Sequence, residues 1–555
     1  MKEDAFPNKI GHDPSPSIDL AVGPDDDRSS ITQMDSIDPI EQTPDGAVVK
    51  PLSSQSQQST MNDVEMGSRI VASESYSVFS RRMKIWITIM ATTASIISPM
   101  TGFIYFPALD TIAKDLNVSI SLINLTLTTY MIFQGLSPTI FGDFGDMAGR
   151  RPAFILAFSI YLCANIGLAL QRNYAALMVL RCLQSAGSSG TLALSFAVIA
   201  DITPTAERGR YMGFVGVGAN IGPAIGPVIG GLLSQYLGWP SIFWLCAIFV
   251  TLWLIPWVTT IPEMGRNVVG NGSIPPQPWN ITLVEFLRRR KTGEKPDPGP
   301  KRKLRFPNPI GTLLITFEKQ MGQTLLIASI VYVNFILVSA TLSTLFSQIY
   351  NFSELQVGLC YLPYGFGCCM TVLFQGYVLD WNYRRIAKSL GVDASHGRRN
   401  DIGNFPIESA RIQPIYPALS LGALALIGYG WALQAEVTVA VPLVLLFIIG
   451  MLVPSSFNIL NTLIVDLHPN STATAAAANN LVRCLFGAVG TAVVDYMLKA
   501  MGRGWCFTFL ALLMLACMPW LRFIEKRGPR WRAEKLRRKG STDSDQSDST
   551  TAEEK

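Results

Sequence analysis

The sequence predicts an all-α membrane protein with twelve transmembrane helices in two six-helix bundles. Its 555 residues are 49% hydrophobic and only 15% charged, whereas soluble domains carry roughly 25% charged residues. The charges gather in the tails and a few interior segments and leave uncharged apolar runs of about 18 to 25 residues, which suit a hydrocarbon core about 30 Å thick. Twelve such runs form two sets of six on either side of one long hydrophilic stretch.

Five regions are expected along the chain. Residues 1–80 are rich in Ser, Asp, Pro and Gln and predict a disordered cytosolic tail, because they hold too little apolar surface to offset ordering entropy. They contain no signal-peptide pattern, so the first span is expected to act as the insertion signal. The first bundle is expected at 81–261, a cytosolic central loop at 262–321, the second bundle at 322–522 and a cytosolic C-terminal tail at 523–555.

Lysine and arginine in the short loops set the expected orientation. Arg150, Arg151 and Arg208 lie in even-numbered connections, whereas the odd-numbered connections are nearly free of basic residues. By the positive-inside rule, both termini are therefore cytosolic. The sequons at Asn117 and Asn351 then fall on the outer side and are predicted glycosylation sites. The spans are expected near 85–107, 119–141, 153–171, 175–200, 211–234, 240–261, 322–346, 356–379, 411–433, 437–463, 473–497 and 503–522.

One polar pattern occurs twice, each time after the second span of a six-span set. The first copy is Gly142, Asp146, Gly149, Arg150 and Arg151, and the second is Gly376, Asp380, Arg384 and Arg385. Recurrence at the same topological position indicates two homologous halves, as in many secondary transporters. Since Asp146 can contact a helix N-terminus or an arginine, we expect an inner-gate latch in which Asp201 pairs with Arg150. A positive-inside turn with no gating role is the alternative.

Ionisable residues are scarce within the predicted spans. Arg181 is a cation inside the fourth span, which is costly unless it is paired or faces a wet cavity. It is therefore a functional candidate, and a structural arginine that binds carbonyl groups is the alternative. Asp110 and Asp495 lie near outer ends of spans, and no Asp or Glu lies at the middle of any predicted span.

Polar and aromatic residues inside the spans predict a central cavity. As a set, with Phe and Met nearby, they describe a large amphipathic pocket for bulky, mostly apolar organic molecules. Any one of them could equally be an interhelical hydrogen bond. The candidates are Tyr130, Gln134, Gln184, Asn334, Tyr361, Tyr364, Asn458, Asn461 and Arg483.

Several function classes are excluded by the sequence. The net charge of +5 averages unlike regions and implies no nucleic-acid partner. All nine cysteines fall inside apolar runs without paired spacing, and the three histidines fall in tails or loops, so no metal site is expected. No phosphate-binding loop and no nucleophile–base pair occurs, so neither a nucleotide nor another cofactor is expected, and the protein is not expected to be an enzyme.

Four segments resemble motifs of the major facilitator superfamily. "GDFGDMAGRRP" resembles the loop signature G-x-x-x-D-R-x-G-R-R, with Met147 in place of the usual basic residue, and "RCLQSAGSSG" resembles the second motif. "GANIGPAIGPVIGG" resembles the antiporter motif G-x-x-x-G-P-x-x-G. With "HPNSTATAAAANNLVRCLFGAVGTAVVD", these segments make residues 80–525 similar to fungal twelve-span drug:H⁺ antiporters near the quinidine-resistance group.

The resemblance implies a monomeric efflux pump that exports amphipathic drugs or metabolites in exchange for protons by alternating access. It implies the fungal plasma membrane rather than the vacuole as the location. It implies a part in proton coupling for Arg181, for which Asp110 and Asp495 are further candidates. It also implies that the small-residue face of the fifth span packs on a helix of the other half and resists ion leakage. That face holds Gly218, Gly222, Pro223, Gly226 and Pro227.

Two other functions stay open. The same fold could export one specific secondary metabolite or organic acid. A protein of another class, a non-transporting receptor or scaffold whose long tails bind partners, is the second alternative.

Overall fold

The computed structural model describes residues 76–277, 280–292, 310–391, 405–468 and 472–553. Residues 1–75 of the expected tail, and parts of the expected central loop, lie outside the described residues.

The first half of the chain forms six long helical segments joined by short turns. The first segment consists of three consecutive helices, and each of the other five is one helix. In order they are α2 (Arg81–Phe103), η1 (Phe106–Ala108) and α3 (Leu109–Asp115), then α4 (Ile120–Ala148), α5 (Arg150–Leu170), α6 (Tyr174–Ile202), α7 (Thr205–Leu237) and α8 (Pro240–Thr260).

The second half repeats this plan after three short helices, α9 (Arg266–Val269), α10 (Leu283–Thr292) and α11 (Ile310–Thr316). The last helix is interrupted at Gly502, whose φ of 77° breaks it into two. The helices of this half are α12 (Lys319–Tyr350), α13 (Glu354–Ser389), α14 (Ile407–Ile412), α15 (Ile415–Gln434), α16 (Ala440–Leu467) and α17 (Thr472–Glu553).

The described residues hold enough long helices for twelve spans. Ten helical segments are long and apolar enough to cross a membrane. The interruption at Gly502 divides one of these ten into two spans. The twelfth span is α4, which has 29 residues. It carries many threonines, serines and glycines and two aspartates. The prediction of a twelve-helix membrane protein is confirmed.

The turn between the first two spans is the same in both halves. Asn117 and Asn351 both adopt the left-handed conformation with φ of 53°, which asparagine tolerates better than most residues. Two residues later, the hydroxyls of Ser119 and Ser353 accept N–H bonds from the first turns of α4 and α13, as N-cap serines do. Each Asn-x-Ser triplet therefore forms the tight turn that connects the first two spans of its half.

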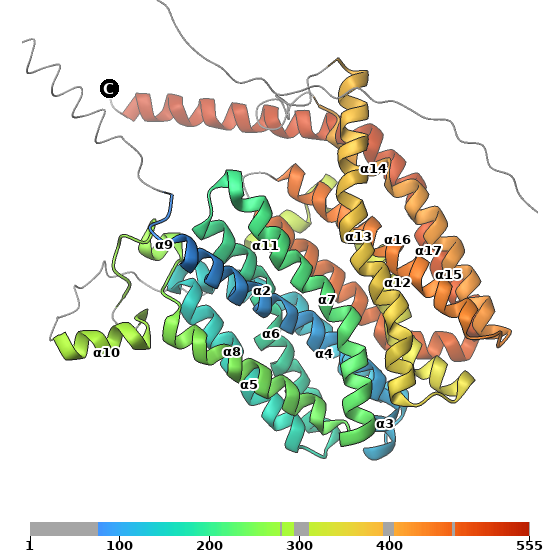
Figure 1. The fold of residues 1–555 in the computed structure, drawn as a ribbon. Coiled ribbons are helices and arrows are strands. Elements are labelled where there is room, and N and C mark those ends of the chain that lie inside the picture. The colour runs from blue at the N-terminus through green and yellow to red at the C-terminus, as the bar shows by residue number, and fades with distance from the viewer. Residues whose placement is uncertain (1–75, 278–279, 293–309, 392–404, 469–471, 554–555) are drawn as a thin grey trace, which may run out of the picture. The chain divides into compact units, whose positions relative to one another are not determined.

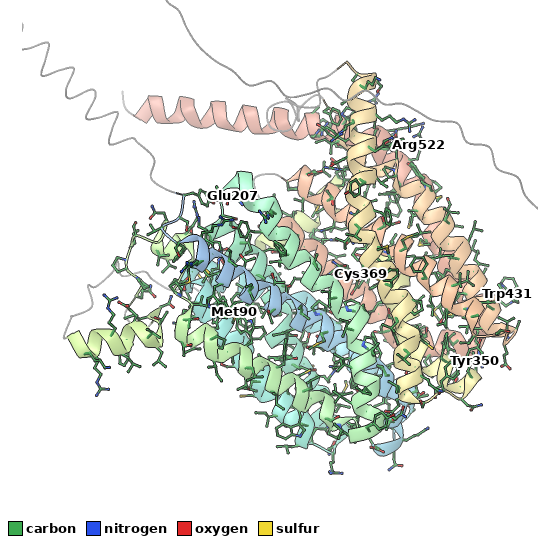
Figure 2. The ribbon with its side chains drawn as sticks, in the orientation of Figure 1. Met90, Glu207, Tyr350, Cys369, Trp431 and Arg522 are labelled. Carbon is green, nitrogen blue, oxygen red and sulfur yellow. The ribbon has the colours of Figure 1, made fainter. Side chains whose placement is uncertain are left out.

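Helix packing defines two halves with two main contacts between them (Figure 1). In the first half α6 contacts α2, α4 and α5, while α5 contacts α8. In the second half α16 contacts α12, α13 and α15, and α17 contacts α12 and α15. The halves meet where α7 crosses α13 and where α4 lies along α17. Cys369, labelled in Figure 2, lies at the first of these crossings, where its thiol is 3.8 Å from the Asn220 carbonyl oxygen.

Candidate functional site

The two halves are held together at one end of the helices. We call this the Asn117 end, and the opposite end, where α5 begins, the Arg150 end. At the Asn117 end the Thr111 hydroxyl of α3 donates to the Glu354 carboxylate of α13. Nearby, the Leu355 N–H donates to Gln235 Oε1 of α7 at 3.0 Å.

The contact between α7 and α13 stops halfway along both helices. A Cβ on Gly358 of α13 would lie 2.6 Å from the Pro227 carbonyl oxygen, and one on Gly365 would lie 2.6 Å from Ala224 Cβ. Toward the Arg150 end, the same stripe of α7 continues through Gly216 and Gly213, where an added Cβ would meet no described atom of another helix within 4 Å. Gly376 of α13 has no neighbour within 4 Å either. The interface is therefore closed at the Asn117 end and open toward the Arg150 end.

The glycines of the antiporter motif face a different helix from the one expected. Cβ atoms on Gly218, Gly222 and Gly226 would contact α2 of the same half, with Gly222 only 2.6 Å from the Met100 backbone nitrogen. The four-residue spacing explains this placement, because residues four apart share one helix face. Only Pro227 of the predicted set contributes to the contact with α13, while Pro223 lies inside α7 beside Gly222.

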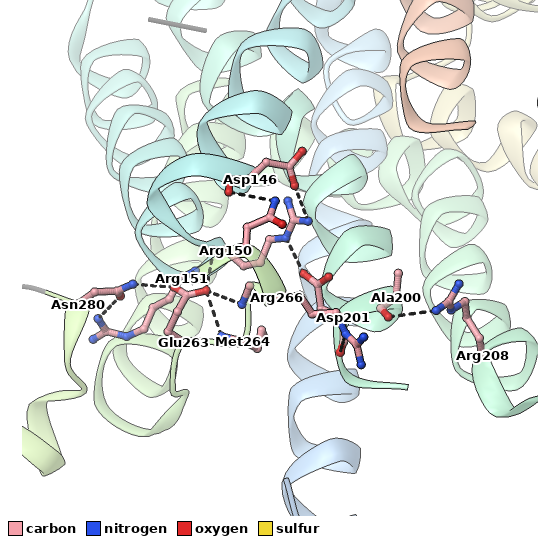
Figure 3. A network of polar contacts seen from close by, with 12 residues as sticks. Asp146, Arg150, Arg151, Ala200, Asp201, Arg208, Glu263, Met264, Arg266 and Asn280 are labelled. Atoms are coloured by element: carbon pink, nitrogen blue, oxygen red, sulfur yellow. Dashed lines mark hydrogen bonds and ion pairs between the residues drawn. The ribbon is translucent and has the colours of Figure 1, made fainter. Parts of the chain in front are cut away.

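A buried ion-pair cluster ties the Arg150 end of the first half together (Figure 3). The Arg150 guanidinium bridges two carboxylates, Asp146 at 2.6 Å and Asp201 at 2.8 Å. The expected pairing of Asp201 with Arg150 is present. Because these partners lie on α4, α5 and α6, the cluster fixes three helices of one half. It does not link the two halves in this conformation, as a closed inner gate would.

Sequence reasoning missed the carboxylate at the centre of this cluster. Glu263, only 3% exposed, accepts the backbone N–H groups of Arg150 at 2.8 Å and Arg151 at 3.1 Å and thereby caps α5. Asn280 donates to the same carboxylate at 2.8 Å and accepts from the Arg151 guanidinium. Gly149 is required here, because its φ is +114° and a Cβ would lie 2.6 Å from the Glu263 carboxyl carbon. The sequence feature that could have identified Glu263 is its place in the segment IPEMGR, directly after α8.

The second half contains an ion pair that corresponds to Arg150–Asp201, but its arginine is not Arg384 or Arg385. Arg411 of α14 binds Asp466 of α16 at 2.9 Å. This pair joins the start of the ninth span to the end of the tenth, as Arg150 and Asp201 join the third span to the fourth. Arg384 and Arg385 instead lie exposed on the last turns of α13. Their separation from α14 by residues 390–406 explains why Arg411 takes the position of Arg150.

The other members of the second copy lie on the same outward part of α13. Gly376 and Asp380 are exposed, and the Arg385 guanidinium lies 5.6 Å from the ring centre of Trp381. Gly142 of the first copy likewise has no neighbour within 4 Å.

Arg181 is completely buried inside the first half. Its guanidinium lies 4.2 Å from the ring centre of Tyr105 and 4.3 Å from that of Tyr130. Nη1 donates to Gln184 Oε1 at 2.6 Å, and Gln184 donates in turn to Asn165 at 2.7 Å. Nε and Nη2 are buried without a hydrogen-bond partner among the described residues. The expected alternative of carbonyl binding does not describe this site.

Arg483 heads a second polar cluster on the α17 face of the interface. Its Nε and Nη2 donate to Asn480 Oδ1 at 3.2 and 2.8 Å, and the guanidinium lies 4.9 Å from the ring centre of Tyr332. The Asn480 amide donates across the interface to the Gln134 carbonyl oxygen at 2.9 Å. Asn479 donates to Asn461 at 2.8 Å, and Asn458 lies one turn before Thr462 on the same helix.

A small cavity lies between the two clusters. The cavity has a mixed lining of apolar side chains and a few polar groups, and it includes residues of both halves. Its walls are formed by Pro99, Gly102, Phe103, Phe106, Leu127, Tyr130, Met131, Gln134, Tyr332, Ile336 and Thr491.

Three cavity candidates belong to the interior of the second half instead. The hydroxyls of Tyr361 and Tyr364 donate to the carbonyl oxygens of Ser339 and Phe335, at 2.6 and 2.8 Å, and both rings are completely buried. Asn334 donates to a carbonyl of its own helix and is 1% exposed. Their contacts are those of interhelical packing, the interpretation that the sequence left equally open.

Both outer aspartates lie at the Asn117 end. Asp110 is 3.5 Å from the Thr344 hydroxyl and lines a wide surface pocket together with Asn117 and Asn351. Asp495 pairs with Lys499 at 2.7 Å and accepts from Ser121 of α4. Both aspartates therefore join the two halves at the closed end, far along the helices from Arg150.

Two six-helix halves with a cavity between them are an architecture of membrane transporters. Residues 91–491 match the family model of the Major Facilitator Superfamily, and the chain belongs to this family.

The most informative relatives are fungal. The chain is 42% identical over 476 residues to the MFS-type transporter phiD of Fungal sp. (strain ATCC 74256), an alignment that covers 85% of this chain and 72% of the relative. It is 36% identical over 471 residues to Citrate exporter 1 of Aspergillus niger, covering 83% and 89%. Among solved structures, a D-xylose–proton symporter superposes with a TM-score of 0.57 at 14% identity, over 80% of this chain and 97% of the symporter. The likeness to the symporter is a likeness of fold alone.

Proposed function

We propose that this protein exports a small amphipathic organic compound from the cytosol across the plasma membrane by alternating access, coupled to proton entry. The observation that carries the proposal is the interface between the halves, which is closed at the Asn117 end and open at the Arg150 end around a polar centre. With the Arg150 end in the cytosol, as the loop charges favour, this is the conformation that loads substrate from inside.

The relatives support export as the direction. One of them is named an exporter, of citrate, and the named substrate is a single metabolite rather than a range of drugs. We therefore rank a dedicated exporter of one metabolite beside the broad drug:H⁺ antiporter as the second candidate. The scaffold alternative has less support, because a polar cavity between two halves has no use in a static anchor.

Proton coupling requires groups that change charge as the halves rock. Asp110 and Asp495 lie half-buried at the interface between the halves and contact the opposite half, so opening of the Asn117 end changes the surroundings of both carboxylates. Arg181 lies deeper, within contact of Tyr130 on the cavity wall. We propose that protons enter at the aspartates and that the Arg181 charge disfavours entry of a cation into the cavity.

The test compares the culture medium of deletion and complemented strains by untargeted mass spectrometry. We expect at least one compound to be lost from the medium on deletion and to accumulate inside the cells. A protonophore should abolish the difference. Gradient-dependent accumulation caused by the wild-type protein would identify an importer instead. Complementation by a chain lacking residues 1–75 should restore export, which a tail-based scaffold would not do.

A further inference from the structure

Two arginines within the predicted spans flank the cavity between the halves. Arg181 comes from α6 of the first half and Arg483 from α17 of the second half. Each guanidinium lies on a tyrosine ring, that of Tyr130 at 4.3 Å and that of Tyr332 at 4.9 Å. Both tyrosines line the same cavity. The cavity therefore lies between two cations.

Neither cation is neutralised by the protein in the part of the chain that the structure describes. The hydrogen-bond acceptors of the two guanidiniums are amide oxygens, Gln184 Oε1 for Arg181 and Asn480 Oδ1 for Arg483. Among the described residues, Nε and Nη2 of Arg181 are buried with no hydrogen-bond acceptor. Four aspartates at the ends of the spans bind other groups: Asp110, Asp201, Asp466 and Asp495.

Arg483 is the arginine that a ligand can reach. It is half-buried, whereas Arg181 is fully enclosed. Its guanidinium uses one edge on Asn480 and keeps Nη1 available for a second acceptor. Carboxylates suit this geometry, because a planar guanidinium offers them paired N–H groups. Asn479, next to Asn480 in the sequence, donates to Asn461 of α16 at 2.8 Å.

We propose that the substrate is an organic anion, bound through a carboxylate to Arg483, with its less polar body against the cavity wall formed by Phe103, Met131 and Ile336. The inference rests on the proposed export function and names its substrate class. A carboxylate supplies the negative charge that two buried cations lack, and buried charges are stable when paired. The positive field of Arg181 across the same cavity disfavours cationic drugs.

The experiment identifies the charge of whatever the protein exports. The compounds that disappear from the medium on deletion are passed over a strong anion exchanger at pH 7, before and after methyl esterification. We expect them to be retained before esterification and released after it. Compounds that pass through unretained would be neutral or cationic and would overturn the proposal. Loss of no compound would instead refute export itself, so the two failures are distinct.

A matched set of variants locates the anion site. Arg483→Gln should reduce the export rate by at least about tenfold, as expected for loss of one charge-assisted contact, and Arg483→Lys should restore part of it. Arg385→Gln, on the exposed end of α13, is the control and should export at the wild-type rate. Gel filtration in detergent monitors folding. Wild-type export by a folded Arg483→Gln protein would overturn the assignment of Arg483, whereas the exchanger result stands without any variant.

Discussion

Arg411 and Asp466 form an ion pair at 2.9 Å that occupies, in the second half, the position of the Arg150–Asp201 pair in the first. Each pair joins the start of a third helix to the end of a fourth. Both pairs lie at the open end of the interface, and all four residues belong to intact halves. Each pair therefore holds two helices of its own half together at this end.

Loss of a buried partner should be more harmful than loss of an exposed one. The Asp201 side chain is 11% exposed and that of Asp146 is 50% exposed. We expect Asp201→Asn to lower the free energy of unfolding by about 1–3 kcal/mol, because Arg150 keeps only its solvent-screened partner. Asp146→Asn should cost less than about 1 kcal/mol. Thermal unfolding of the purified proteins measures the order, and a larger loss for Asp146→Asn would contradict it.

The two copies of the loop pattern should respond unequally. Asp380 is exposed near the end of α13, where solvent screens its interactions, while Asp146 binds Arg150 in the cluster that joins α4, α5 and α6. Asp380→Asn should therefore leave export near the wild-type level, and Asp146→Asn should reduce it. In the second half the counterpart of Asp201 is Asp466, so Asp466→Asn should resemble Asp201→Asn. Equal export by the Asp146 and Asp380 variants, measured in the same vesicle preparation, would remove the claimed difference.

Glu263 should be among the most sensitive carboxylates of the chain. It accepts two backbone N–H groups at the positive end of α5 and one amide N–H from Asn280. Glu263→Gln removes the charge and replaces one acceptor by a donor that faces N–H groups. We expect a loss of about 1–3 kcal/mol in unfolding free energy. Glu207→Gln, an exposed change in the first turn of α7, is the control and should unfold like the wild type.

The glycines of the interface predict how the closed end opens. Gly358→Ala places a methyl group 2.6 Å from the Pro227 carbonyl oxygen, and overpacking of this kind costs about 1–3 kcal/mol. The strain is relieved when the Asn117 end opens, so the variant should favour the outward-open state by at least about fivefold. Labelling of a cysteine introduced at Thr344 reports that opening. Gly376→Ala meets no neighbour and should label like the wild type.

Gly222→Val should act differently, because Gly222 faces α2 of its own half. We expect it to disturb the packing of α7 on α2 and to lower both stability and export. It should not raise labelling at the Asn117 end, as Gly358→Ala does.

The sequence predicted the fold more completely than the site. Apolar runs of fixed length report membrane spans directly, and the confirmed family follows from ordered motifs. The expected position of Asp201 and Arg150 at the same ends of their spans also paired them. Long-range partners were out of reach, because nothing local in the sequence links Glu263 to the N-terminus of α5, or Arg411 to Asp466. Tyr361 and Tyr364 were chosen for their polarity, yet helix rotation, which a weakly amphipathic span does not reveal, turns them into the packed interior.

Arg181 offers a prediction that separates a functional residue from a structural one. Its guanidinium is held by two rings and one amide oxygen, and two of its nitrogens have no acceptor. Insertion of an arginine at the centre of a span costs about 2.5–3.5 kcal/mol, and a desolvated cation–π contact returns about 2 kcal/mol. Arg181→Met fills similar space without the charge. We therefore expect the variant to unfold at the wild-type temperature or a few degrees above it, while gradient-driven export falls by at least about tenfold.

Arg151→Met is the structural comparison, since Arg151 donates to the Val258 carbonyl and to Asn280, and it should unfold at a lower temperature. Export and unfolding are measured on the same purified protein, before and after reconstitution into vesicles with an imposed pH gradient. A destabilised Arg181→Met protein that still exports at the wild-type rate would make Arg181 a packing residue and would move the coupling role to Asp110 or Asp495.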